Sequence, residues 1–202
     1  MRRGKTIAAA LTVCAVGAGM TVNAYAASTT FEMRKKAVSL LGILSTSNYQ
    51  ANVSRGEFAE LLMKASDYRE SANAAGTVSV FADVSAKSQY STAIRTAVTN
   101  SWMSGYLRGN FKPDEGITMR DAVKAVLGVL GYTNEDFSGS LQESRLAKFK
   151  ALSLDSEIYR DQDEVLTRED CINPLYIHEG DKVNNGTKIA DLYDERKFRF
   201  RS

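Results

Sequence analysis

The sequence predicts a mainly α-helical protein built from three helix–loop–helix units. Apolar residues recur at helical spacing in successive pairs of segments. A short helix-starting motif also occurs three times, beginning at Val53, Ile117 and Leu166. Because internal repetition on this scale is typical of modular architectures, we expect each copy of the motif to begin the second helix of one unit.

Composition limits the classes of function. The chain has 202 residues, of which 44% are hydrophobic, so it can bury a substantial core. Its formal net charge is only +2. This balance argues against a nucleic-acid-binding protein held by a broad basic surface.

Residues 1–26 have the pattern of a secretory signal. Three cations precede an apolar run over residues 7–22, and Ala24-Tyr25-Ala26 has the small-x-small form of a cleavage site. A membrane anchor is the alternative, but the run is short for a span of about 20 residues. Lipidation at Cys14 is only faintly suggested, because apolar sequence continues beyond it. We therefore expect export, and no stable membrane span after cleavage.

Removal of residues 1–26 would leave 23 cations and 24 anions, a net charge of −1, and Cys171 as the one cysteine. An intrachain disulfide is then impossible. The one histidine, His178, has no Cys/His cluster around it in the sequence, which argues against a zinc site and against a nucleophilic triad. The acidic stretch 155–164 lacks the twelve-residue calcium pattern. We expect no metal, no cofactor and no catalytic residues.

The first unit is expected at residues 27–75. Its second helix should start at Ser54, and residues 71–77 have the small, polar composition of a linker. Helical spacing predicts that its first helix buries Met33, Ala37, Leu40, Leu41 and Leu44, and that its second buries Phe58, Leu61, Leu62 and Ala65.

The second unit, at residues 78–133, has the most complete pattern. Its first helix should bury Ala93, Ile94, Ala97 and Val98. The second helix should run over residues 119–130, with Gly131 as its C-terminal stop.

The third unit, at residues 137–178, diverges from the pattern of the second unit. A first helix is expected over residues 144–152, and a second from Thr167. Pro174 follows seven residues later, and an interior proline costs about 3 kcal/mol, so this helix should kink or restart. Residues 179–202 form a tail, for which we expect a loose terminus.

Each helix start has the form of a capping box, in which a hydroxyl accepts from the backbone N–H three residues on and the carboxylate returns to the cap residue. The pairs are Ser54 with Glu57, Thr118 with Asp121, and Thr167 with Asp170.

The capping box does not account for Arg55 and Arg168. Both take the first helical position, where the helix dipole disfavours a cation by about 0.3–1 kcal/mol. An anion bound to the free N–H groups of the helix end, and to the guanidinium, would explain them. Solvated arginines are the alternative. The second unit has Met119 at this position and Arg120 next to it.

Three further motifs belong to the second unit: Phe81-Ala-Asp-Val84, Gly105-Tyr106 and Phe111-Lys-Pro113. Together with the helix starts they resemble the S-layer homology family over about residues 31–177. The resemblance implies a compact pseudo-threefold helical assembly. In this family the grooves between repeats bind secondary cell-wall polysaccharide, often through a pyruvylated amino sugar, and the motif arginines contact it.

The resemblance makes Arg55, Arg168 and Arg120 candidate carbohydrate-binding residues. Tyr106 and Trp102 could stack on a sugar ring. Core packing is the alternative for both aromatic residues, and the stronger one for Trp102. The implied role is noncovalent anchoring of a secreted protein to the bacterial cell wall or S-layer, without enzymatic activity.

Two other classes stay open. One is a cell-wall hydrolase, which would need two carboxylates flanking a cleft. The other is a module that binds envelope or S-layer proteins and has lost sugar binding. Met119, Pro174 and the short first loop favour this second alternative.

Overall fold

The computed structural model describes residues 31–45, 47–71 and 81–176. The predicted signal segment, the linker after residue 71, His178 and the tail lie outside the described residues. The described part is mainly helical, as predicted, and its only β pairings are isolated bridges.

The helices follow the predicted order. Residues 31–40 are helical and are followed by turns. The remaining elements are α2 (Arg55–Lys64), the 3-10 helix η1 (Asp67–Ser71), α3 (Ser91–Thr99), α4 (Met119–Val129), the 3-10 helix η2 (Asn134–Asp136), α5 (Leu141–Ala151) and α6 (Ile172–Leu175).

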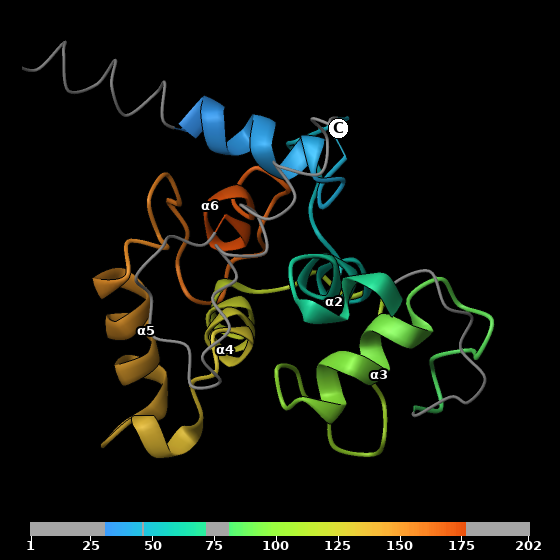
Figure 1. The fold of residues 1–202 in the computed structure, drawn as a ribbon. Helices are drawn as coiled ribbons and strands as arrows, with labels where there is room; N and C mark the ends of the chain where they lie inside the picture. Colours follow the sequence, from blue (N-terminus) through green and yellow to red (C-terminus); the bar gives the residue numbers. More distant parts are fainter. Residues whose placement is uncertain (1–30, 46, 72–80, 177–202) are drawn as a thin grey trace, which may run out of the picture.

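The motif-started helices lie in the middle of the molecule. Figure 1 shows α2, α4 and α6 gathered there, with α3 and α5 on opposite sides and the helix over residues 31–40 above them. Contacts join α2 to α3 and to α4, and α4 to α5. The 31–40 helix is tied to α6 because Arg34 Nη1 donates to Asn173 Oδ1 at 2.8 Å.

The predicted core of the second unit is largely correct. Ala93, Ile94 and Ala97 are buried, whereas Val98 is only partly so. α4 ends at the cap residue Leu130, and Gly131 follows with φ +84°, a conformation that glycine adopts at low cost. The apolar face of α2 is also as predicted, since Phe58, Leu61, Leu62 and Ala65 are all buried.

The predicted face of the first helix is only partly correct. Leu44 is buried and Leu41 packs against the core, as predicted. Met33 and Leu40, however, are 64% and 77% exposed, and Val38 and Ile43 are buried in addition. The helix ends at residue 40, and Gly42 adopts φ +64° in the turn that follows. Ile43 and Leu44 therefore reach the core from the turn rather than from the helix.

The third unit departs from prediction in both helices. α5 begins at Leu141, three residues early, because the Ser140 hydroxyl caps it by accepting from Glu143 N–H. Residues 168–171 form turns, and the α-helix starts only at Ile172. Pro174 lies inside this four-residue helix and has no N–H to offer to the carbonyl of Asp170. The expected helix from Thr167 is thus a turn followed by a short helix.

Candidate functional site

The three helix starts meet through a closed ring of backbone hydrogen bonds. Val53 N–H donates to the carbonyl of Leu166 at 2.9 Å, Leu166 N–H to that of Ile117 at 3.0 Å, and Ile117 N–H to that of Val53 at 2.9 Å. All three side chains are fully buried. The motif copies, which are distant in sequence, are therefore neighbours in space.

The N–H groups at these starts are already bonded. At each start, the first and second N–H groups after the cap residue donate to carbonyls in the loop that precedes another start. The first set is Arg55 to Glu115, Met119 to Glu164 and Arg168 to Ala51; the second is Gly56 to Pro113, Arg120 to Gln162 and Glu169 to Tyr49, all at 2.8–3.0 Å. The expectation that these N–H groups are free to bind an anion is wrong, because loop carbonyls of the protein accept hydrogen bonds from them.

The third N–H group at each start is bonded to the cap hydroxyl. Ser54 accepts from Glu57 N–H, and Thr118 from Asp121 N–H. The returning carboxylate contact forms only in the third unit, where Asp170 accepts from the N–H and the hydroxyl of Thr167, both at 2.8 Å.

The carboxylates of Glu57 and Asp121 are engaged differently, because each pairs with an arginine of another helix start. Arg55 Nη1 donates to Asp121 at 2.7 Å, and Arg168 Nε donates to Glu57 at 2.6 Å. The Glu57 partner raises the pKa of the Arg168 guanidinium. The anion that each motif arginine meets is thus a carboxylate of the neighbouring unit.

Arg55 is a buried residue with only 3% of its side chain exposed. Besides Asp121, it donates from Nε to the Phe111 carbonyl at 3.0 Å and from Nη2 to the Ser104 carbonyl at 2.7 Å. Its guanidinium also lies 4.7 Å from the centre of the Tyr106 ring. Arg55 therefore fixes the loop of the second unit in place.

Arg168 is less enclosed, with a side chain that is 25% exposed, and it also donates to the Ser47 carbonyl at 3.3 Å. Met119, which takes the corresponding position in the second unit, cannot pair with Asp170. Arg160 does so instead, through Nε at 2.9 Å. An arginine therefore neutralises the motif carboxylate at every one of the three starts.

A cavity of about 130 Å³ brings together three of the predicted site residues, Arg55, Trp102 and Tyr106. Asp121 and Lys124 complete its charged lining. The cavity lies where the start of α2 meets the loop after α3. Its lining has two aromatic side chains and two cations against one carboxylate, a combination that suits a small polar ligand with one negative charge.

The two aromatic residues differ in exposure. Trp102 is only 6% exposed and packs edge-on against Tyr68, with ring centres 5.7 Å apart, so most of its surface belongs to the core. Tyr106 is 39% exposed. Its hydroxyl pKa is raised by partial burial. Lys112 Nζ lies 4.4 Å from the centre of its ring. Tyr106 is therefore the aromatic side chain in this cavity with surface available for a ligand.

Arg120 lies apart from these residues. It lines a second cavity, between α4 and α5, and forms an ion pair with Asp163 at 2.5 Å. Arg168 lines neither of these cavities. The structure thus separates the five predicted carbohydrate-binding residues into three locations.

Sequence analysis missed Lys124, which lines both cavities. Its Nζ donates to Ser104 Oγ at 2.6 Å. Burial lowers the pKa of this amine, and the nearby charge of Arg145 lowers it further. The available signal was spacing, because Lys124 follows Asp121 by three residues and so lies on the same side of α4.

Other chemistry finds little support in the described part of the chain. No three His, Cys, Asp or Glu side chains gather there as they would around a metal ion. Cys171 is a free and fully buried thiol, and burial raises its pKa, so it is poorly suited to act as a nucleophile. None of the helices in the described ranges has the length and hydrophobicity needed to cross a bilayer.

Comparison with models of protein families finds a similarity over part of the chain. Among curated proteins, none is similar enough to the chain to count as a match. Residues 80–119 match the model of the S-layer homology domain. The matched segment contains α3, the loop with Tyr106 and the start of α4. S-layer homology domains are non-catalytic modules that anchor proteins to cell-wall polysaccharide at the bacterial surface. The predicted resemblance to the S-layer homology family is thereby confirmed over residues 80–119, which are similar to that domain.

Proposed function

We propose that this chain anchors a secreted protein noncovalently to the bacterial cell wall by binding an acidic secondary cell-wall polysaccharide. The observation that carries the proposal is the cavity beside Tyr106, which lies mostly within the segment that matches the S-layer homology domain. A pyruvate ketal on an amino sugar is the group that we assign to this cavity.

The roles of the side chains follow from their exposure. Tyr106 offers the partly exposed ring on which a sugar packs, and Lys124 offers the ammonium group for the carboxylate. Arg55 is a positioning residue, because three of its donors are already bonded to Asp121 and to two carbonyls. A bound carboxylate would favour the charged form of Lys124 and so offset the effect of burial on its pKa.

We also propose that the three units, at residues 27–75, 78–133 and 137–178, share a pseudo-threefold axis through the ring of Val53, Ile117 and Leu166. The cyclic order of the three hydrogen bonds supports this arrangement. So does the repeated pattern of first and second N–H groups donating to the next loop. Arg168 and Glu57 would then occupy the position between the third and first units that Arg55 and Asp121 occupy between the first and second.

The test is sedimentation of the full chain with purified Gram-positive cell walls that carry pyruvylated polysaccharide. Matched walls extracted with hydrofluoric acid lack that polymer. We expect binding to the native walls and at least tenfold weaker binding to the extracted walls. Equal binding to both would refute the proposal and would indicate a protein or peptidoglycan partner instead.

Variants then locate the site. Tyr106→Ala should weaken binding about tenfold, which corresponds to about 1.4 kcal/mol. Tyr159→Ala is the matched control, since this tyrosine is 86% exposed and lines neither cavity. Equal effects of the two substitutions would place the carbohydrate site elsewhere.

A further inference from the structure

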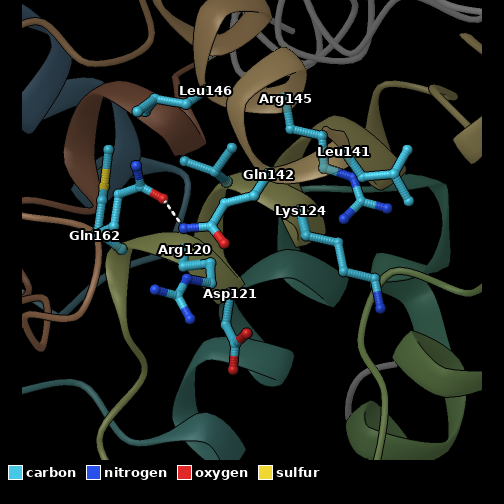
Figure 2. Close-up of a pocket in the computed structure, with 10 residues that line it drawn as sticks. Arg120, Asp121, Lys124, Leu141, Gln142, Arg145, Leu146 and Gln162 are labelled. Atoms are coloured by element: carbon cyan, nitrogen blue, oxygen red, sulfur yellow. Dashed lines mark hydrogen bonds between the residues drawn. The ribbon is translucent and has the colours of Figure 1, made fainter. Parts of the chain in front are cut away.

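The cavity between α4 and α5 is larger than the one beside Tyr106, with a volume of about 220 Å³. Figure 2 shows the charged ends of its lining side chains around the open space, with the Gln142 amide between Arg120 and Lys124. Leu141 and Leu146 of α5 form part of its apolar wall. The open space therefore lies directly against α5.

The described part of the protein covers α5 poorly. Phe149 is the one buried residue among its eleven, whereas six of the eleven residues of α4 are buried. Leu141 is 37% exposed. Helices in proteins are stabilised mainly by the packing of an apolar face. A further contact along the open side of α5 would therefore stabilise this helix.

The corresponding space between α2 and α3 is filled by a side chain of the protein itself. Gly56 takes the second helical position of α2, and a Cβ atom there would lie 2.6 Å from Cδ2 of Tyr90. The tyrosine ring thus packs directly on the helix. In α4 the same position is Arg120, as the matching backbone hydrogen bonds show, and here the space is open. An aromatic or apolar side chain from another part of the chain can fill it in the same way.

The charges of the lining indicate what else the occupant carries. Its charged residues are one carboxylate and three cations, Asp121, Arg120, Lys124 and Arg145. Asp121 is already paired with an arginine of α2. Lys124 and Arg145 donate to uncharged acceptors, and Arg120 pairs only with Asp163, whose side chain is 80% exposed. Because so exposed an ion pair contributes little, the lining favours an occupant with several carboxylates.

A segment of the tail, residues 189–195, has this combination of side chains. It lies outside the described residues and reads Ile-Ala-Asp-Leu-Tyr-Asp-Glu, with three carboxylates and no cation. Its large apolar residues, Ile189, Leu192 and Tyr193, have the i, i+3, i+4 spacing of one side of a helix. The segment thus complements both the apolar wall and the basic rim of the cavity.

The chain between α6 and this segment is long enough for the contact. Residues 177–188 follow α6, and twelve residues can span about 40 Å. The radius of gyration of a folded body as large as the described part is about 14 Å. The segment can therefore reach the cavity from the end of α6.

We propose that residues 189–195 dock in the cavity between α4 and α5. Leu192 and Tyr193 pack against the apolar wall, and the carboxylates of the segment meet the cations of the rim. The docking itself does not rest on the proposed function. Its consequence does: the two cavities share Asp121 and Lys124, so a docked segment competes with a wall polymer that binds beside Tyr106.

Hydrogen exchange of the α5 amides in the full chain measures the docking. Combined Leu192→Ser and Tyr193→Ser substitutions should raise α5 exchange at least fivefold, because the helix loses its cover, and should leave α2 exchange unchanged. Phe198→Ser with Phe200→Ser is the matched control, since it removes two aromatic rings from the same tail outside the segment. Unchanged α5 exchange in the first variant, or an equal rise in both, overturns the proposal.

A second pair of variants tests the charges. Asp191→Asn with Asp194→Asn should raise α5 exchange at least twofold, because attractions to the cations of the rim are lost. Glu179→Gln with Asp181→Asn removes the same charge from the same tail outside the segment and should have no effect. Equal exchange in these two variants would show that the segment does not meet the basic lining, contrary to the proposal.

The dependence on concentration distinguishes docking within one chain from docking between copies. We expect the same α5 exchange at two chain concentrations that differ tenfold. Protection that increases with concentration would overturn docking within the chain and would indicate that the tail of a second copy occupies the cavity.

Wall binding tests the competition separately. The Leu192→Ser and Tyr193→Ser variant should bind native walls about threefold more tightly than the unaltered chain, because the competing segment is removed. Unchanged wall binding together with faster α5 exchange would overturn the competition. Absence of wall binding in the unaltered chain and in the variant would refute the anchoring function, and hydrogen exchange would then decide by itself whether the segment docks.

Discussion

Replacement of Arg55 by methionine should destabilise the fold substantially. The substitution keeps an apolar stem but removes the guanidinium, which leaves the carboxylate of Asp121 and the carbonyls of Ser104 and Phe111 without their donor. Breaking a buried ion pair costs about 3–5 kcal/mol. Because the Asp121 side chain is 41% exposed and water can hydrate it, we expect a smaller loss, about 2–4 kcal/mol of the free energy of unfolding.

Urea unfolding, followed by the fluorescence of the single tryptophan, measures this loss. Trp102 is buried, so its emission should report the transition. Arg168→Met is the comparison, since this arginine is 25% exposed and should contribute only about 1 kcal/mol. Arg55→Lys should recover less than half of the loss, because an ammonium group cannot reach three separated acceptors. A cost for Arg55→Met no greater than that for Arg168→Met would refute the argument that the buried network stabilises the fold.

Three further substitutions test the packing around the helix starts. Gly56→Ala should cost about 1–3 kcal/mol in thermal or urea unfolding, because the new methyl group would press on the Tyr90 ring; a neutral result would mean that the ring moves away freely. Asp83 accepts hydrogen bonds from two backbone N–H groups, and these bonds lower the pKa of its carboxyl group although burial acts in the opposite direction. The contribution of Asp83 to the free energy of unfolding is therefore present above the unfolded-state pKa near 3.9 and is lost as the pH falls through the folded-state pKa. The difference in unfolding free energy between wild type and Asp83→Asn should thus begin to narrow as the pH falls below about 4, and a difference that is unchanged from pH 7 to the lowest accessible pH would contradict this. Arg160→Gln should cost about 1–2 kcal/mol by leaving Asp170 without its cation, and a change below 0.3 kcal/mol would show that the pair is unimportant.

Local patterns predicted the second unit well. Helical spacing was enough to predict that Ala93, Ile94 and Ala97 are buried, and Gly131 was enough to predict the end of α4. Each of these features depends on residues within a few positions in the chain. The first helix was harder to predict. Met33, Leu40 and Leu44 fit a helical stripe, but the helix ends before Gly42, and of these three only Leu44 is buried. Ile43 is buried beside it, a choice that only tertiary packing determines.

The candidate site was harder to predict from the sequence than the helices were. The unfavourable position of Arg55 in the helix dipole led us to expect a bound anion, whereas the carboxylate of Asp121 in the same chain pairs with it. Nothing local identified that anion as Asp121, 66 residues away, or showed that loop carbonyls would occupy the N–H groups. Lys124 and Arg145 belong to no motif and became candidates only when α4 and α5 were seen to enclose a cavity.

The hydrogen-bonded ring at the helix starts has a consequence for folding kinetics. It closes only when Leu166 reaches Val53, more than a hundred residues earlier in the chain, so its formation requires contacts of high sequence separation. A chain emerging during synthesis or export could form α2 and α4 early, yet the N–H of Val53 would lack its native acceptor until residue 166 had followed. A truncation before that residue would therefore leave an open edge, and we expect such fragments to associate or to be degraded rather than to persist as a stable pair of units.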